Sequence, residues 1–392
     1  MSTVAEHIVD RSGAWMADPG FGIYVHIPFC RHRCHYCDFN TFEGQDSLHD
    51  TYVDALVRSI ELHLGDTRPA TSVFFGGGTP TLLPAKDLGR ILDALRNRVG
   101  LQPDTEITVE ANPETVDEEK FSQLLEAGFN RVSVGVQSLV PKVLAGLGRT
   151  HSPEVALEAL RAARRAGFSD VSGDLIYGSP WETEGDWLRS LKGLLEVEPA
   201  HISAYALTVE EGTPLATLVS TGRVQDVDPD VQADRHEVAE RLLGPAGFER
   251  YEVSNWARPG RASRHNVLYW SAGEYLGFGA GAHGHVAGRR YWSTRLPRDF
   301  ISQVAERGSA EAGFEELDRE ARVTEALTLG LRLTSGISVP DFDVRFGAAV
   351  LDSRRPAIED LMSAGLLDRS GDRLRIAPRA AMISNEVFTR LI

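Results

Sequence analysis

Short hydrophobic runs alternate with amphipathic stretches along the first half of the chain. Each run is rich in β-branched or aromatic residues, and in the stretch after it apolar residues recur at helical spacing. The predicted strands are Gly22–His26, Ser72–Phe75, Glu106–Glu110, Arg131–Val134, Asp170–Asp174 and Ile202–Ala206. The predicted helices are Tyr52–Leu64, Leu88–Val99, Glu118–Ala127, Pro153–Ala166 and Gly185–Val197. Several are followed by a glycine typical of left-handed C-caps, at Gly65, Gly100, Gly128 and Gly167.

This alternation predicts parallel strands joined by helical crossovers. Six such units predict an α/β fold, an incomplete (three-quarter) parallel (β/α)6 barrel over residues 21–210, preceded by an N-terminal arm at 1–20. In such barrels the functional residues lie at the carboxyl ends of the strands. We therefore look for chemistry directly after each predicted strand.

The pattern changes in the second half of the chain. Residues 211–315 form an extension with a helix predicted at Val231–Leu243 and a dense glycine turn at Gly277–Gly284. That turn resembles a dinucleotide fingerprint but lacks the surrounding strand–turn–helix unit, so we expect only a close-packed turn. Residues 316–392 contain helices at Arg319–Leu333 and Ala357–Ala364 and a strand pair around Asp368–Ile376, which predicts a winged-helix-like C-terminal domain.

The net charge and the composition limit which classes of binding partner are expected. The chain has 392 residues and a formal net charge of −15, which disfavours binding to nucleic acid or an anionic membrane. The acidic C-terminal region favours a packing or partner role over DNA binding. No apolar run reaches the length of a membrane span, and the first residues lack the apolar core of a secretory signal. We expect a cytoplasmic protein whose cysteines stay reduced.

All three cysteines, Cys30, Cys34 and Cys37, follow the first strand within eight positions. Three thiolates can hold one iron–sulfur cluster but leave one of four irons open to an exogenous ligand. The arginines and histidines between them favour the thiolate form. A zinc site that lacks its fourth ligand and plain buried cysteines are the alternatives.

Polar residues and glycines mark the ends of the other strands. A Gly-Gly-Gly-Thr-Pro turn, which includes Gly77, Gly78 and Thr79, follows the second strand, and glycine lets backbone approach a ligand closely. Arg149 lies in a segment after the fourth strand, and arginine suits a carboxylate. The polar residues that close or follow the third, fourth and fifth strands are Glu110, Gln137 and Asp174.

The C-x-x-x-C-x-x-C spacing, with Tyr36 before the last cysteine, resembles the radical S-adenosylmethionine superfamily. The resemblance implies a [4Fe–4S] cluster on the three cysteines, with S-adenosylmethionine chelated to the open iron. It also implies which residues contact S-adenosylmethionine. These are Tyr24, Gly77, Gly78, Thr79, Glu110, Gln137, Arg149 and Asp174.

The sequences around these residues resemble the HemN-like branch, related to oxygen-independent coproporphyrinogen III oxidase. Two features depart from the oxidase: Phe39 stands where the oxidase has a further cysteine, and only 23 residues precede Tyr24. An H-N-x-x-Y-W string from His265 to Trp270 resembles the HemW branch of heme chaperones instead. Chemistry alone favours His265 as a hydrogen-bonded core residue, whereas the resemblance implies a heme ligand.

Three functions stay open. The first is a heme chaperone whose partners are heme and an unidentified acceptor protein, with peripheral contact to a membrane-bound acceptor left open. The second is an enzyme similar to the oxidase, which removes two propionate carboxyls from coproporphyrinogen III. The third is a radical enzyme that acts on an unrelated substrate, such as nucleic acid. We favour the chaperone, expect no nucleic-acid partner and assign no catalytic residue.

Overall fold

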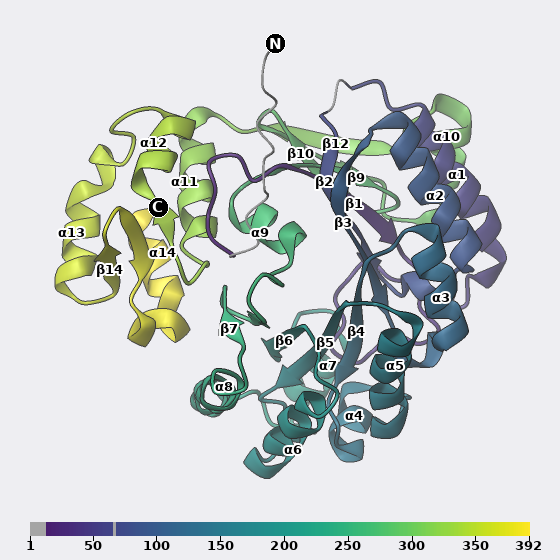
Figure 1. The fold of residues 1–392 in the computed structure, drawn as a ribbon, viewed down its shortest axis with the longest axis horizontal. Helices are drawn as coiled ribbons and strands as arrows, with labels where there is room; N and C mark the ends of the chain where they lie inside the picture. Colours follow the sequence, from purple (N-terminus) through teal and green to yellow (C-terminus); the bar gives the residue numbers. More distant parts are fainter. Residues whose placement is uncertain (1–12, 66–67) are drawn as a thin grey trace.

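The computed structural model describes residues 13–65 and 68–392, and in this part of the chain twelve strands form one sheet (Figure 1). Residues 1–12 of the predicted N-terminal arm lie outside the described residues. Six neighbouring strands run parallel in sequence order, which confirms the six predicted strands. They are β1 (Phe21–Ile27), β2 (Ala70–Gly77), β3 (Leu101–Ala111), β4 (Arg131–Gln137), β5 (Asp170–Tyr177) and β6 (His201–Ala206).

Helices connect these strands, and Figure 1 shows α1, α2, α3 and α5 along one face of the sheet. Each helix packs through an apolar stripe at helical spacing: α2 buries Leu88, Ile91, Leu92 and Leu95. The five predicted helices are therefore confirmed, with one addition, α4. The bounds are α1 (His49–Glu61), α2 (Ala85–Arg98), α3 (Glu118–Ala127), α4 (Pro141–Leu147), α5 (Pro153–Ala166) and α6 (Glu184–Leu195).

The predicted glycine caps are confirmed in part. Gly128 and Gly167 cap α3 and α5 in the left-handed conformation, with φ of 104° and 115°. Gly100, with φ of 84°, directly follows the C-cap of α2. The cap predicted at Gly65 is wrong, because α1 already ends at Glu61 with Leu62 as its C-cap.

The extension lengthens the sheet at both edges. Strand β9 pairs parallel with β1, and β8 pairs antiparallel with β6. The glycine turn predicted at 277–284 is shorter in the structure, because Gly277 and Phe278 belong to β9 and His283 already begins β10. The strands are β7 (Glu249–Arg250), β8 (Asn255–Ala257), β9 (Glu274–Phe278), β10 (His283–Val286), β11 (Arg289–Ser293) and β12 (Glu311–Glu316). The helices are α7 (Pro214–Ser220), α8 (Pro229–Leu243), α9 (Arg264–Trp270) and α10 (Pro297–Arg307).

The C-terminal residues form a second unit with its own apolar core. Phe342, Leu361 and Leu374 are buried there, and Trp15 from the start of the described chain packs against Phe342 with ring centroids 5.5 Å apart. The predicted strand pair is confirmed as β14 and β15, joined at Gly371. The elements are α11 (Arg319–Gly330), β13 (Ile337–Ser338), α12 (Val339–Phe346), α13 (Arg355–Ser363), β14 (Leu367–Ser370), β15 (Arg373–Ile376) and α14 (Ser384–Leu391).

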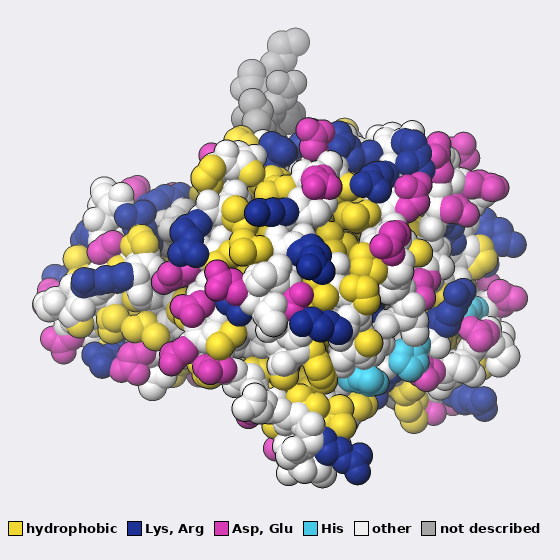
Figure 2. All heavy atoms as spheres, turned by 90° about the horizontal axis from the view of Figure 1, so that it is seen from below, with side chains coloured by type: hydrophobic (Ala, Val, Ile, Leu, Met, Phe, Trp, Pro, Cys, Tyr) yellow, Lys and Arg dark blue, Asp and Glu magenta, His cyan; other side chains and the backbone are white. Residues whose placement is uncertain are grey.

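Helix α9 lies where the two parts meet. It contacts β1 and β2 of the large sheet and α11 of the C-terminal unit (Figure 1). Within the two described ranges, none of the helices is long and apolar enough to cross a membrane. On the face seen in Figure 2, acidic, basic and hydrophobic side chains are interspersed, and neither sign of charge dominates.

Candidate functional site

The cysteine loop, residues 28–42, leaves the carboxyl end of β1 and folds back on itself. Two backbone hydrogen bonds close its base: Cys30 N donates to Phe42 O (3.0 Å), and Phe42 N donates to Pro28 O (2.8 Å). Cys37 N donates to Cys34 O (3.2 Å) in a turn. The three cysteines are free and half-buried, and they share one cavity of about 150 Å³, called here the cysteine cavity. Its lining includes Cys30, Cys34, Cys37, Gly77, Gly78, Thr79, Glu110, Gln137, Arg149 and Asp174.

Hydroxyl groups lie beside two of the sulfurs. Thr79 Oγ1 is 3.7 Å from Cys30 Sγ, and Thr41 Oγ1 is 3.9 Å from Cys37 Sγ. Burial raises the pKa of Cys30 to about 11 and also raises the pKa of Cys37. These thiols therefore need a nearby positive charge to ionise, and iron supplies one. The residues present fit an iron–sulfur cluster.

The zinc alternative has less support. In the described part of the chain, no three His, Cys, Asp or Glu side chains converge on a point where one metal ion could bind. Zinc requires such convergence because all its ligands bind one ion, whereas cluster cysteines each bind a different iron.

The glycine turn after β2 packs tightly against the cysteine loop. Gly77 has φ of 108°, and a Cβ there would overlap the His26 ring. A Cβ on Gly78 would lie 2.5 Å from Phe29 O, an oxygen that also accepts a hydrogen bond from Thr79 N (2.7 Å). Glycine is thus required at both positions by packing, and the exposed backbone lines the cavity.

Two carboxylates from β3 and β5 face the cysteine cavity. Glu110 Oε2 accepts from Gly77 N (3.1 Å), and Asp174 accepts from Ser133 (2.8 Å) and Ser172 (3.0 Å). Burial, followed by the charge of Asp174, raises the pKa of Glu110 to about 7. Burial likewise raises the pKa of Asp174. A cationic ligand between them would favour the ionised form of both.

Gln137 and Arg149 complete the side of the cavity formed by β4 and the segment after it. A bulge between Gly135 and Gln137 places Gln137 at φ of 63°, an uncommon conformation for a residue with a side chain. Arg149 Nη1 lies 3.3 Å from Cys34 Sγ, and its Nη2 donates to Gly135 O (3.0 Å). Arg149 therefore places a positive charge beside one cysteine sulfur.

Tyr24 is not among the residues that line the cysteine cavity. Its hydroxyl lies 2.9 Å from His26 Nδ1, and His26 Nε2 lies 2.9 Å from Asn40 O. The same His26 ring packs against Gly77. In this structure Tyr24 supports the glycine turn through His26 instead of contacting the cavity directly.

His265 lies in the core, away from the cysteine cavity. It is 1% exposed, its Nδ1 is 2.9 Å from Ser72 Oγ, and its ring stacks on Phe74. Burial, with the charge of Arg131, lowers the pKa of His265 to about 3, so the ring is neutral. Its Nε2 has no hydrogen-bond partner within the described residues. Ligation of a heme iron by His265 therefore requires α9 to move.

A buried carboxylate holds the amino end of α9. Glu106 of β3 is 2% exposed and accepts hydrogen bonds from Arg264 N (3.0 Å) and His265 N (3.1 Å). These are backbone donors of the first helical turn, which have no partner within the helix. Glu106 thus fixes the helix that carries the H-N-x-x-Y-W string.

The remaining residues of the string pack between the two parts of the molecule. Asn266 Nδ2 donates to Tyr251 Oη (3.3 Å), and the Tyr269 ring meets the Tyr275 ring edge-on. The ring of Trp270 lies under the Arg332 guanidinium of the C-terminal unit. As the structure stands, the string stabilises the junction.

Other residues of the cysteine cavity were not predicted from the sequence. Asn112 and Ser133 line the cysteine cavity, where Asn112 accepts a hydrogen bond from Arg149 and Ser133 donates to Asp174. Asn112 directly follows β3, so its strand-end position was the available signal. Ser133 lies within β4, where no sequence signal separates a cavity-facing serine from a core one.

Comparison with known proteins decides the family. The family model of the radical SAM superfamily matches residues 24–194, and that of the HemN C-terminal domain matches residues 317–383. A protein of Mycobacterium tuberculosis named heme chaperone HemW is 41% identical over 377 residues, or 95% of each chain. The chain belongs to the HemW family. The predicted resemblance is confirmed.

Other HemW proteins match over similar lengths. The Bacillus subtilis protein is 36% identical over 93% of this chain and 97% of its own, and the Escherichia coli protein is 34% identical over 94% and 97%. As a HemW member in the radical SAM superfamily, the chain has a [4Fe–4S] cluster and S-adenosylmethionine as cofactors.

A solved structure confirms the α/β architecture with its mostly parallel sheet. Escherichia coli coproporphyrinogen III oxidase, HemN, described as a radical SAM enzyme, superposes on this HemW member with a TM-score of 0.81. The match covers 97% of this chain and 92% of the oxidase at 22% sequence identity. At that identity the two proteins share the fold, and the match carries no assignment of activity.

Proposed function

We propose that this chain is a heme chaperone, which binds heme and passes it to an acceptor protein. The observation that carries the proposal is the 41% identity, over 95% of both chains, to a protein named as a heme chaperone. The cysteine that the oxidase is expected to have at the position of Phe39 is absent here, which favours the chaperone over the oxidase.

We infer that Cys30, Cys34 and Cys37 hold the cluster in the cysteine cavity. S-adenosylmethionine then lies against the glycine turn and the polar residues of the strand ends. The residues assigned to it are Gly77, Gly78, Thr79, Glu110, Gln137, Arg149 and Asp174, with Tyr24 supporting the turn through His26.

When bound, the cluster and S-adenosylmethionine supply one-electron chemistry. The chain itself provides binding and orientation. Glu110 and Asp174 place negative charge where a sulfonium or ammonium group needs a partner, and the Gly77–Gly78 backbone allows close approach. Arg149 lies beside Cys34 and offsets the negative charge of a thiolate-bound cluster.

His265 is our candidate for the heme ligand. Its ring is neutral, as an iron ligand must be, and its Nε2 has no hydrogen-bond partner among the described residues. Because His265 is buried, we infer that α9 leaves its position when heme binds. Tyr269 and Trp270 would then become available to cover the porphyrin.

The wider architecture is also part of the proposal. We infer a three-quarter (β/α)6 barrel at 21–210 behind an arm at 1–20, an extension at 211–315 and a winged-helix-like domain at 316–392. The sequential parallel order of β1 to β6 and the hairpin of β14 and β15 support this division. Three free cysteines in one loop favour a cytoplasmic location.

A transfer assay tests the function. Cluster-loaded protein is charged with heme under anaerobic conditions and mixed with an apo-hemoprotein, and the transfer is followed by absorption. We expect one saturable heme per chain and its appearance in the acceptor. In parallel, coproporphyrinogen III is supplied with S-adenosylmethionine and a reductant. Decarboxylated product without saturable heme binding would replace the chaperone proposal with the oxidase.

A further inference from the structure

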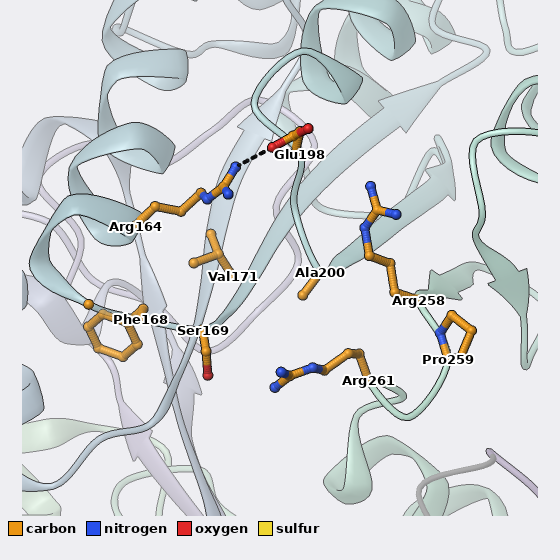
Figure 3. Close-up of a pocket in the computed structure, with 10 residues that line it drawn as sticks. Arg164, Phe168, Ser169, Val171, Glu198, Ala200, Arg258, Pro259 and Arg261 are labelled. Atoms are coloured by element: carbon orange, nitrogen blue, oxygen red, sulfur yellow. Dashed lines mark hydrogen bonds and ion pairs between the residues drawn. The ribbon is translucent and has the colours of Figure 1, made fainter.

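A second cavity lies at the opposite end of the strands from the cysteines. It has a volume of about 700 Å³ and is formed at the amino ends of β5 and β6 and by the loop after β8 (Figure 3). Three arginines and one glutamate line it, so the charged groups of the lining sum to +2 in a chain whose net charge is −15. We call it the arginine cavity, after Arg164, Arg258 and Arg261.

Arg164 is already paired. Its Nη1 lies 3.3 Å from Glu198 Oε2 and donates to Val197 O (2.7 Å), and Figure 3 shows this pair at one end of the cavity. The free positive charge therefore comes from the other two arginines.

Arg258 is held in place without a carboxylate partner. Its guanidinium lies 4.8 Å from the centroid of the Phe248 ring, and its Nε donates to Pro199 O (3.3 Å). Among the residues that the structure describes, no acidic side chain forms an ion pair with it. Its two terminal nitrogens are thus positioned and available to an anion.

Arg261 lies near the carboxylate of Asp170, which is also close to Arg131. Its Nη1 is 3.9 Å from Asp170 Oδ2, and the same carboxylate lies 3.7 Å from the Nε of buried Arg131. Figure 3 shows the Arg261 side chain reaching across the cavity toward Ser169. At 3.9 Å the Arg261–Asp170 contact is longer than a hydrogen bond, so the guanidinium keeps N–H donors for a ligand.

We propose that the arginine cavity binds a small ligand through a doubly negative group, either a phosphate monoester or a pair of carboxylates. Guanidinium groups bind both through paired N–H donors, and such charge-assisted bonds are the strong ones. Val171, Ala200 and Pro259 form an apolar wall for the carbon skeleton. The site lies apart from the cysteine cavity and does not depend on the heme proposal.

Calorimetric titration of the full-length, cluster-loaded protein at low ionic strength tests the inference. Inorganic phosphate, pyrophosphate and glutarate are titrated separately, which distinguishes phosphate from dicarboxylate recognition. We expect one saturable site for at least one probe, with affinity that falls as salt is added. Arg258→Gln and Arg261→Gln each weaken binding about 10-fold or more.

Two further variants separate charge recognition from a folding defect. Arg165→Gln removes an exposed arginine next to Arg164 on α5. Arg165 is already paired with Glu118 and Glu158, so we expect this variant to bind the probes as the wild type does. Glu198→Gln removes the negative charge of the lining and tightens binding. The inference is overturned if none of the probes saturates, or if the Arg258 and Arg261 variants bind as well as the wild type.

Discussion

The cysteine cavity and the α9 junction both contain side chains able to bind a ligand, but only those of the cysteine cavity are accessible to one. At the cysteine cavity, ten predicted residues line one hollow at the carboxyl ends of the strands. At the junction, His265 is 1% exposed and its neighbours in the H-N-x-x-Y-W string are engaged in packing. The first region is a preformed site, whereas the second must open to bind a ligand.

The difference arises because backbone hydrogen bonds hold the cysteine loop, whereas side-chain contacts hold α9. Backbone hydrogen bonds within the cysteine loop close its base, so its side chains are free to face the cavity. Helix α9 is held by a buried carboxylate and by its own side chains, so these cannot also bind a ligand. Binding at α9 would therefore cost the contacts that now hold it.

The largest expected effect is at the cysteines. Replacement of Cys30, Cys34 or Cys37 by alanine removes one of three cluster ligands, and we expect each variant to lose the cluster. Iron and sulfide content, with the paramagnetic signal of the reduced protein, measures this. Thr41→Val, which alters only a neighbour 3.9 Å from Cys37, is the control and retains the cluster. Full iron content in any cysteine variant would refute the ligand assignment.

The next largest effect is the loss of stability when the carboxylate that holds α9 is removed. Glu106→Ala removes the acceptor of two helix-start amides, and we expect the free energy of unfolding to fall by about 3 kcal/mol. Cluster iron content should not change. Asp104→Asn changes a half-exposed residue of the same strand, β3, and leaves hydrogen-bond acceptors for the buried Arg264 guanidinium, so it should cost about 1 kcal/mol or less. Equal losses in chemical denaturation would show that Glu106 has no special role.

A smaller effect concerns pH at the cysteine cavity. Burial and the charge of Asp174 raise the pKa of Glu110 to about 7, and cationic S-adenosylmethionine favours the ionised carboxylate. Affinity should therefore rise as pH increases through 7, by about 10-fold between pH 6 and pH 8. Equilibrium binding measures it, and Glu110→Gln should show weaker binding without this pH dependence. Identical profiles for the two proteins would exclude Glu110 as the titrating group.

Most of the parallel sheet and of the cysteine cavity could be predicted from the sequence. Buried parallel strands give continuous apolar runs, and the polar residues that interrupt them, Glu110 in β3 and Asp174 within β5, line the same cavity. Strand β9 was not predicted because its glycine, Gly277, disfavours strands in general. Here the backbone of β10 passes so close that a Cβ on Gly277 would overlap His283.

The burial of His265 could not be predicted either. The string around it forms a short helix of ordinary appearance, and its position depends on Glu106, about 160 residues earlier in the chain. The sequence contains no local signal for a contact of that range. The same holds for the arginine cavity, where Arg164 and Arg258 come from separate elements.

An anaerobic heme titration of three proteins, wild type, His265→Ala and His201→Ala, tests whether His265 binds the heme iron. Both histidines are buried with Nδ1 on a serine hydroxyl, but His201 Nε2 is 2.9 Å from Tyr251 Oη, whereas His265 Nε2 is unpartnered among the described residues. We expect one saturable heme in the wild type and in His201→Ala, and its loss in His265→Ala. Wild-type binding by His265→Ala, or equal loss in both variants, would contradict this role of His265.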